Sequence, residues 1–215
     1  MTRLYVFDLD GTLVDSLRDL ADSANELLGE CGRPPLAVDA VGRMVGEGAA
    51  QLIARVFAAS GVEMPPDALP RFLTIYDTRL LNHTRAYAGM PETLETLRAK
   101  APLAVLTNKP LEATKRILDG VGLSEFFDAG ILGGDGPQPR KPDPQGMLSL
   151  CERARVTAAD AMLVGDSYID WKTAKNAGTQ ICLARYGFGF REFPQENLNA
   201  GEQLIDAPAD ILSLV

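Results

Sequence analysis

Short apolar runs recur along the chain, and stretches with a helical pattern of apolar residues lie between them. The runs that we expect to form buried strands are residues 4–8, 103–108, 129–134, 161–167 and 180–185. Strands that alternate with helices pack as a parallel sheet with helices on both faces. The pattern therefore predicts an α/β fold built on a doubly wound parallel sheet. The length of 215 residues suits one large domain or two modest ones.

The segment between the first two expected strands differs, because residues 15–87 show helical patterns and no convincing strand. In residues 16–32 the apolar positions recur at helical spacing, at Leu17, Leu20, Ala21, Ala24, Leu27, Leu28 and Cys31. Two further helices are expected, over residues 48–61 and 66–87. We therefore expect a helical cap over residues 15–87, inserted after the first strand of a core that is formed by residues 1–14 and 88–215.

The balance of charges limits the partners of this chain. It has 21 Lys and Arg and 29 Asp and Glu residues, which gives a net charge of −8. Such a surface repels nucleic acid and anionic membranes, so we expect neither as a partner. Two aspartates interrupt the first apolar run before it could serve as a signal peptide, and no run is long enough to span a membrane. We expect a cytoplasmic protein, as a monomer or a homodimer.

The cysteines give no sign of a disulfide framework or a structural zinc site. Cys31, Cys151 and Cys182 lie far apart, no Cys-x-x-Cys pair is present, and His83 is the only histidine. Both kinds of site need more ligands, or closer spacing, than this. We expect the three cysteines to be small apolar side chains in the core.

Two acids stand one residue apart at the end of the first apolar run, where Asp8 and Asp10 precede Gly11. Side chains at positions i and i+2 of an extended chain point the same way, so the two carboxylates can project together. They repel each other unless a cation sits beside them, and hard oxygen ligands of this kind suit Mg²⁺. Gly11 lets the backbone turn sharply and approach a ligand. A solvated acidic turn is the alternative interpretation.

Other expected strands also end in polar side chains. Thr107 and Asn108 offer a hydroxyl and an amide to a phosphate, although threonine also begins helices well. Lys141 precedes prolines that stiffen its loop. The alternative interpretation of Lys141 is a solvated surface lysine. Asp166 ends another buried run and Asp170 follows it, where an acid also favours the start of a helix.

These groups converge if the sheet forms as expected, because ligands of open parallel sheets sit at the carboxyl ends of the strands. The combined set holds several acids, a hydroxyl and a lysine. It can hold Mg²⁺ and a phosphoryl group, with the lysine and the metal offsetting negative charge on the transferring group. The sequence therefore predicts a magnesium-dependent site for a small phosphorylated metabolite.

The same motifs resemble a known family. The segments "DLDGTLVDS", "LTNKP", "GGDGPQPRKPDP" and "GDSYIDWKTAKNAG" are similar, in this order, to those of the haloacid dehalogenase superfamily of phosphohydrolases. The chain is most similar to the phosphoglycolate phosphatase branch, which "VGEGAAQLI" and "YAGMPETLETLR" also resemble less specifically. The resemblance implies a Rossmann-like core with a helical cap, and hydrolysis of a small phosphomonoester, most of all 2-phosphoglycolate.

The resemblance also implies a two-step mechanism. Asp8 would attack phosphorus and form an aspartyl-phosphate, which splits one difficult hydrolysis into two easier steps. Asp10 would protonate the departing alkoxide and then deprotonate the attacking water. An acid at position 10 favours phosphatase over dehalogenase chemistry, because the dehalogenase branch is similar without that acid.

Further residues take their roles from the same resemblance. Mg²⁺ would be held by Asp8, the backbone carbonyl of Asp10 and Asp166, with Asp170 acting directly or through water. Phosphate oxygens would be held by a hydroxyl and an amide, those of Thr107 and Asn108. Lys141 would bridge the nucleophile and the phosphate.

The expected cap offers candidates for binding the substrate carboxylate. Arg43, Gly46 and Gly48 lie just before an expected helix. The two glycines could let backbone amides meet a carboxylate at the helix N-terminus. The alternatives are a flexible joint between helices for the glycines and a surface ion pair for Arg43.

Competing functions share much of this equipment. A sugar-phosphate phosphatase, a pyrophosphatase or a phosphosugar mutase of the same superfamily would use the same core motifs. A phospho-accepting signalling module would also use Asp, Thr and Lys, but its phosphorylated Asp follows a later strand and it carries no long insert. The favoured interpretation stays a phosphatase for 2-phosphoglycolate.

Overall fold

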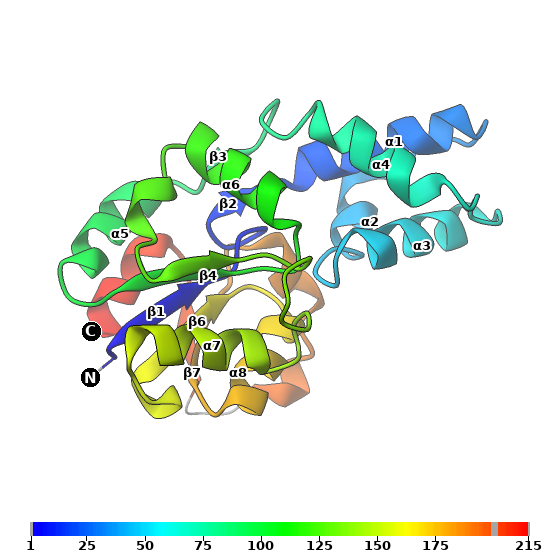
Figure 1. Ribbon diagram of the computed structural model, residues 1–215. Coiled ribbons are helices and arrows are strands. Elements are labelled where there is room, and N and C mark those ends of the chain that lie inside the picture. Colours follow the sequence, from blue (N-terminus) through cyan, green and yellow to red (C-terminus); the bar gives the residue numbers. More distant parts are fainter. Residues whose placement is uncertain (1, 199–201, 215) are drawn as a thin grey trace.

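The computed structural model describes residues 2–198 and 202–214. Its centre is a six-stranded sheet with the order β5-β4-β1-β6-β7-β8, and every neighbouring pair is parallel (Figure 1). The strands are β1 (Leu4–Phe7), β4 (Leu103–Leu106), β5 (Gly130–Leu132), β6 (Ala161–Gly165), β7 (Gln180–Ala184) and β8 (Gln203–Ile205). The doubly wound parallel sheet expected from the sequence is therefore confirmed.

The sixth strand, β8, was not expected. It has three residues, Gln203 to Ile205, and only the last of them is buried. It pairs with β7 in the register Cys182↔Gln203. A strand this short at the edge of a sheet carries no apolar run, so the sequence pattern does not reveal it.

Alternate residues of β1 face opposite sides of the sheet, as the pleat requires. Tyr5 and Phe7 belong to one buried apolar cluster, together with residues of α5 (Met90–Arg98) and α6 (Leu111–Gly120). Leu4 and Val6 belong to a second cluster, with residues of α7 (Gln145–Ala154) and α8 (Tyr168–Ala177). Helices therefore cover both faces, which is why β1, β4 and β6 are apolar at every position (Figure 1).

Four helices lie beyond the carboxyl ends of the strands, on one side of the sheet (Figure 1). They are α1 (Leu17–Glu30), α2 (Val38–Gly42), α3 (Ala49–Ser60) and α4 (Ala68–Asp77). The stripe of α1 is buried at Leu20, Ala21, Ala24, Leu27 and Leu28. This is the arrangement expected of a helical cap, although its limits at residues 15 and 87 stay a prediction.

The expectation that the cap segment holds no strand was wrong, and the helix expected over 66–87 is present but shorter. Helix α4 ends at Asp77, and β3 (Arg85–Ala86) pairs in antiparallel fashion with β2 (Val14–Asp15). The reason lies in Asp19, whose buried carboxylate accepts hydrogen bonds from the backbone N–H groups of His83 and Thr84. These bonds hold the chain extended where it returns to the core.

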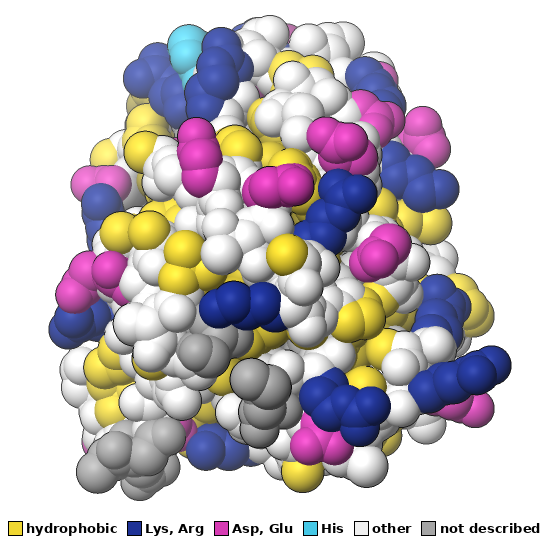
Figure 2. Space-filling model, turned by 90° about the vertical axis from the view of Figure 1, so that its left-hand side faces the viewer, with side chains coloured by type: hydrophobic (Ala, Val, Ile, Leu, Met, Phe, Trp, Pro, Cys, Tyr) yellow, Lys and Arg dark blue, Asp and Glu magenta, His cyan; other side chains and the backbone are white. Residues whose placement is uncertain are grey.

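The surface carries charges of both signs (Figure 2), and two of the three cysteines are buried. On the face shown in Figure 2, acidic and basic side chains are interspersed, with hydrophobic side chains between them. Among the described residues, no helix is long and apolar enough to cross a membrane. The cysteines are free thiols; Cys151 and Cys182 are buried in the core as expected, and Cys31 is half-buried.

Candidate active site

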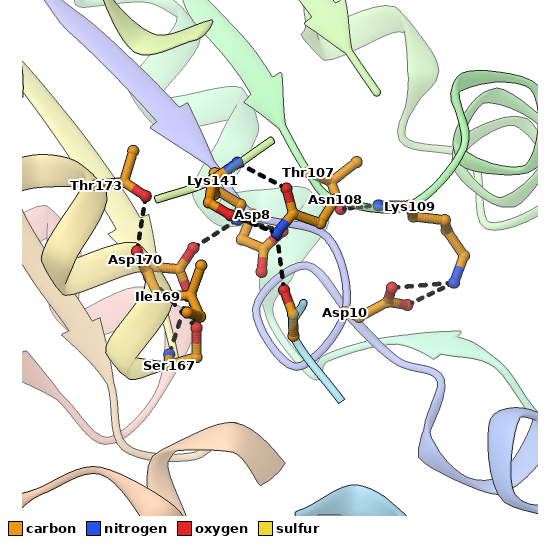
Figure 3. Close-up of polar contacts among 11 residues, drawn as sticks. Asp8, Asp10, Thr107, Asn108, Lys109, Lys141, Ser167, Ile169, Asp170 and Thr173 are labelled. Carbon is orange, nitrogen blue, oxygen red and sulfur yellow. Dashed lines mark hydrogen bonds and ion pairs between the residues drawn. The ribbon is translucent and has the colours of Figure 1, made fainter. Parts of the chain in front are cut away.

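The central ion pairs of the site join three elements at the carboxyl end of the sheet. Asp8 follows β1 directly, Lys141 lies in the loop between β5 and α7, and Asp170 lies in the first turn of α8. Lys141 Nζ is 2.9 Å from Asp8 Oδ1 and 2.6 Å from Asp170 Oδ1 (Figure 3). The Lys141 side chain is only 1% exposed. A buried ammonium is tolerated here because two carboxylates compensate its charge.

A group of three buried carboxylates adjoins this lysine. Asp8, Asp166 and Asp170 each offer an oxygen, and these atoms all lie within 4.8 Å of one another. Burial raises the pKa of Asp8 to about 6, against the opposing charge of Lys141. Burial also raises the pKa of Asp166 well above its usual range, and the nearby charges of Asp170 and Asp8 add to this. One lysine does not offset three acids, so the cluster suits a hard divalent cation with oxygen ligands.

Asp170 is oriented by the start of α8. Ser167 and Asp170 form a capping box, in which the Ser167 hydroxyl donates to Asp170 Oδ2 at 2.6 Å and its backbone N–H donates at 3.1 Å. Oδ1 of the same carboxylate is left to face Lys141. Asp170 therefore positions the lysine as well as contributing to the acidic cluster.

Glycines allow the backbone to approach Asp166 closely. Gly11 has φ +86°, and a Cβ there would lie 1.9 Å from Asp166 Oδ2. Gly189 donates its N–H to the same oxygen at 2.7 Å, and a Cβ at Gly187 would lie 2.2 Å from the Gly11 carbonyl oxygen. The loop after β7 thus forms one wall of the site. These two later glycines were not among the residues predicted from the sequence, and the signal was their place just after a buried strand in "YGFGF".

The side chain of Asn108 makes hydrogen bonds to the Lys141 loop and to the cap. Its Oδ1 accepts from the Lys141 backbone N–H at 2.8 Å, and its Nδ2 donates to the carbonyls of Lys141 (3.0 Å) and Gly46 (2.9 Å). The amide therefore fixes the Lys141 loop and ties it to the cap. Thr107 Oγ1 accepts from the Lys109 N–H at 3.2 Å. The expected contacts of Thr107 and Asn108 with a phosphate stay predictions.

Asp10 points away from the acidic cluster and toward Lys109 (Figure 3). Lys109 Nζ is 3.1 Å from Asp10 Oδ1 and 2.9 Å from Oδ2, and the Ser16 hydroxyl donates to Oδ1 at 2.6 Å. The same ammonium lies 4.6 Å from the ring centroid of Tyr76 in α4. Burial is the largest influence and lowers the pKa of Lys109, but the Asp10 carboxylate and Tyr76 together outweigh it and keep this pKa above its usual range. Lys109 was not among the site residues predicted from the sequence, although it stands within "LTNKP".

A pocket of about 250 Å³ opens between the core and the cap. On the core side its lining includes Asp8, Asp10, Thr107, Asn108 and Asp166, and on the cap side Gly46, Gly48, Leu52, Phe72 and Tyr76. Five expected site residues of the core therefore line one pocket with both glycines of the cap. Lys141 and Asp170 are not among the described lining residues and lie beside Asp8 instead.

Arg43 lies elsewhere. It is not among the described residues that line the pocket, its side chain is 52% exposed, and its Nε is 3.9 Å from Glu192 Oε1. The structure thus favours the surface ion pair over the predicted role of Arg43 as a substrate ligand.

Most of the chain matches a known protein family. A family model described as haloacid dehalogenase-like hydrolase matches residues 5–184. The chain belongs to this family. The family identified from the sequence motifs is thereby confirmed.

Relatives within the haloacid dehalogenase-like hydrolases share most of the chain. A phosphoglycolate phosphatase of Rhodospirillum rubrum is 41% identical over 198 residues, which cover 87% of this chain and 81% of the relative. The phosphoglycolate phosphatase of Caulobacter vibrioides is 36% identical, with 97% and 90% covered. A crystal structure of a predicted phosphoglycolate phosphatase from Haemophilus somnus superposes with a TM-score of 0.91 at 33% identity, covering 99% of this chain and 97% of that one.

Proposed function

We propose that this protein is a Mg²⁺-dependent phosphatase that hydrolyses a small phosphomonoester, 2-phosphoglycolate, through a phosphorylated aspartate. The observation that carries the proposal is the placement of Asp8 at the end of β1, beside the Lys141 ammonium and two further buried acids. A nucleophile, a buried cation and a set of hard oxygen ligands are what phosphoryl transfer requires.

In the first step Asp8 attacks phosphorus, a bond forms between its carboxylate oxygen and phosphorus, and the ester bond to the alkoxide breaks. Lys141 is placed to stabilise the negative charge of the transferring group, because its ammonium is already 2.9 Å from Asp8 Oδ1. Asp170 keeps this ammonium in place at 2.6 Å. Thr107 lines the same pocket and can donate its hydroxyl to a phosphate oxygen.

Asp10 moves the proton. It gives a proton to the departing alkoxide and then takes one from the water that attacks the phosphorylated Asp8. Both acids line the pocket, and Asp10 is held on its far side by Ser16 and Lys109. The two acids therefore have separate surroundings, as separate roles require.

The residues that would hold Mg²⁺ are Asp8 and Asp166, with the Asp10 backbone carbonyl, and Asp170 directly or through water. The bound ion would offset negative charge on the phosphoryl group. Three buried carboxylates lie close together, and burial raises the pKa of two of them, Asp8 and Asp166. This is consistent with a site for such an ion. All of these oxygen ligands belong to this chain.

The substrate assignment rests on two lines of support. Relatives that share 36–41% of residues over most of the chain are named phosphoglycolate phosphatases. The pocket is lined on the cap side by side chains such as Leu52 and Phe72, and its volume of about 250 Å³ gives room for a small leaving group.

A phosphate-release assay tests the proposal. The panel contains 2-phosphoglycolate, sugar phosphates and pyrophosphate, with Mg²⁺ and with EDTA, and the control is Asp8→Asn. We expect release from 2-phosphoglycolate to exceed the others and to disappear with EDTA or in the variant. Preference for a sugar phosphate or pyrophosphate would overturn the substrate, and release without metal would overturn the mechanism.

A further inference from the structure

The charges that line the pocket are mostly negative. Asp8, Asp10, Asp77, Glu112 and Asp166 are among the described lining residues, whereas Lys109 is the only lysine or arginine among them. Asp77 is paired with Arg116, which is not in the lining. Among the described residues of the lining, Lys109 is therefore the one cation that can face a second anionic group of the substrate.

Lys109 is held in place from two directions. Its side chain is 4% exposed, its ammonium contacts both oxygens of Asp10, and the ring of Tyr76 lies 4.6 Å away on the cap side. An ammonium has three N–H donors, so these contacts with Asp10 leave capacity for one more acceptor. Holding a lysine this way reduces the entropy that it would lose on binding a ligand.

The position of Lys109 relative to the reaction follows from Asp10. In the proposed mechanism Asp10 contacts the ester oxygen of the leaving group, and Lys109 Nζ is 2.9 Å from Asp10. In 2-phosphoglycolate a single CH₂ carbon separates the ester oxygen from the carboxylate. A leaving group that contacts Asp10 with its ester oxygen can therefore place its carboxylate within reach of Lys109.

We propose that Lys109 binds the anionic group of the leaving portion, and so selects phosphomonoesters with a carboxylate beside the ester oxygen. This inference rests on the proposed function, since it takes Asp10 as the residue that contacts the ester oxygen. The shared contact with Asp10 places substrate selection and proton transfer at adjacent side chains. The exposed Arg43, which the sequence suggested for this role, is not required.

The experiment compares two substrates of similar size in two proteins. 2-Phosphoglycolate carries the carboxylate, and 2-hydroxyethyl phosphate carries a neutral hydroxyl in its place. We expect Lys109→Met to lower the ratio of their kcat/KM values by roughly 10- to 100-fold, through the loss of a charge-assisted hydrogen bond. If the variant also disturbs Asp10, the kcat/KM values of both substrates fall by the same factor, so the ratio of the two values is unaffected.

Two further variants complete the test. Lys109→Arg keeps the charge and should retain more of the ratio than Lys109→Met, while Arg43→Met should keep the ratio of the wild type. Thermal unfolding checks that each variant folds, and Lys109→Gln replaces the methionine variant if that one does not. An unchanged ratio in the neutral variants, or a fall in Arg43→Met instead, would overturn the inference.

Failure of this inference differs from failure of the proposed function. The proposed function fails if the wild type prefers another phosphomonoester in the full panel, or releases no phosphate. The inference fails if the wild type prefers 2-phosphoglycolate and the ratio does not depend on Lys109.

Discussion

Lys141 Nζ lies 2.9 Å from Asp8 Oδ1, and both side chains are buried at the carboxyl end of the sheet. The two residues come from distant parts of the chain, and the parallel order of β1, β4 and β5 brings them together. The Asn108 side chain fixes the backbone of Lys141 with two hydrogen bonds, so the position of the ammonium is determined by the core. This contact joins the proposed nucleophile to its charge partner before any substrate binds.

Replacing Lys141 should affect catalysis far more than replacing an exposed lysine. We expect Lys141→Met to lower kcat/KM by roughly 10²- to 10³-fold, because the charge that faces the transferring phosphoryl group is lost. The matched control is Lys100→Met, at an exposed position after α5, which should keep the wild-type value. Steady-state kinetics with 2-phosphoglycolate check both. Equal activity of the two variants would refute the role of Lys141.

Alanine substitutions at Gly11 and Gly32 should distinguish the effect of a steric clash from the effect of backbone strain. Both have positive φ, +86° and +67°, but only a Cβ at Gly11 meets a neighbour, Asp166 Oδ2 at 1.9 Å. We expect Gly32→Ala to cost about 1 kcal/mol of stability and to keep full activity. Gly11→Ala should lose at least about 10²-fold in kcat/KM, because Asp166 must move. The comparison needs denaturant unfolding and kinetics, and an active Gly11→Ala enzyme would contradict the tight packing at Asp166.

Asp19 should contribute strongly to stability although it lies outside the pocket. Its carboxylate accepts hydrogen bonds from His83 N–H, Thr84 N–H and the Thr84 hydroxyl, with the Thr84 contacts at 2.8 Å. Asp19→Ala leaves these buried donors unpaired, which should cost about 2–4 kcal/mol in urea unfolding. The control is Asp22→Ala, which removes a surface ion pair with Arg18 and should cost less than about 1 kcal/mol. Similar losses in both variants would show that the buried contacts are unimportant.

The stability of the metal-free protein should depend on pH through Asp8. Its pKa is about 6 in the fold because of burial, and near 4 in an unfolded chain. A carboxyl with a raised pKa in the fold binds more protons there, so its contribution to stability is complete below about pH 4 and is lost as the pH rises through about 6. In EDTA we therefore expect the Tm of the wild type to fall over this window relative to Asp8→Asn.

Mg²⁺ should reverse that dependence. The ion binds ionised carboxylates, so the rise in Tm that it causes should grow with pH across the same window. Thermal unfolding with Mg²⁺ and with EDTA, at pH values on both sides of about 6, measures this rise. An increase in Tm of equal size at every pH, or none at all, would contradict metal binding at Asp8 and Asp166.

The sequence was sufficient for the core of the fold and for most of the proposed site. β1, β4 and β6 are buried at every position, so each appears as an uninterrupted apolar run that ends in polar residues. A parallel sheet then gathers those strand ends at one edge, whatever the details of the helices. Asp8, Thr107 and Asp166 could be grouped on that basis alone.

Contacts between segments that are distant in the sequence could not be predicted in the same way. Nothing in the local sequence distinguishes Lys109 from a surface lysine. Its position is set by contacts with Asp10, which lies 99 positions away, and with Tyr76 on the cap. The side-chain amide of Asn108 donates hydrogen bonds to the carbonyls of Gly46 and Lys141, which are also distant in the sequence. Arg43 could be a substrate ligand or part of a surface ion pair. The sequence could not distinguish these two interpretations, because its partner Glu192 is distant in the sequence.

The most direct test of the account is to find where the phosphoryl group goes during turnover. Enzyme with Mg²⁺ and 2-phosphoglycolate labelled in the phosphate is quenched within the first turnover, and the labelled peptide is identified by mass spectrometry. The account predicts label on Asp8, with none in Asp8→Asn. Label on another residue, or phosphate release from Asp8→Asn at the wild-type rate, would contradict it.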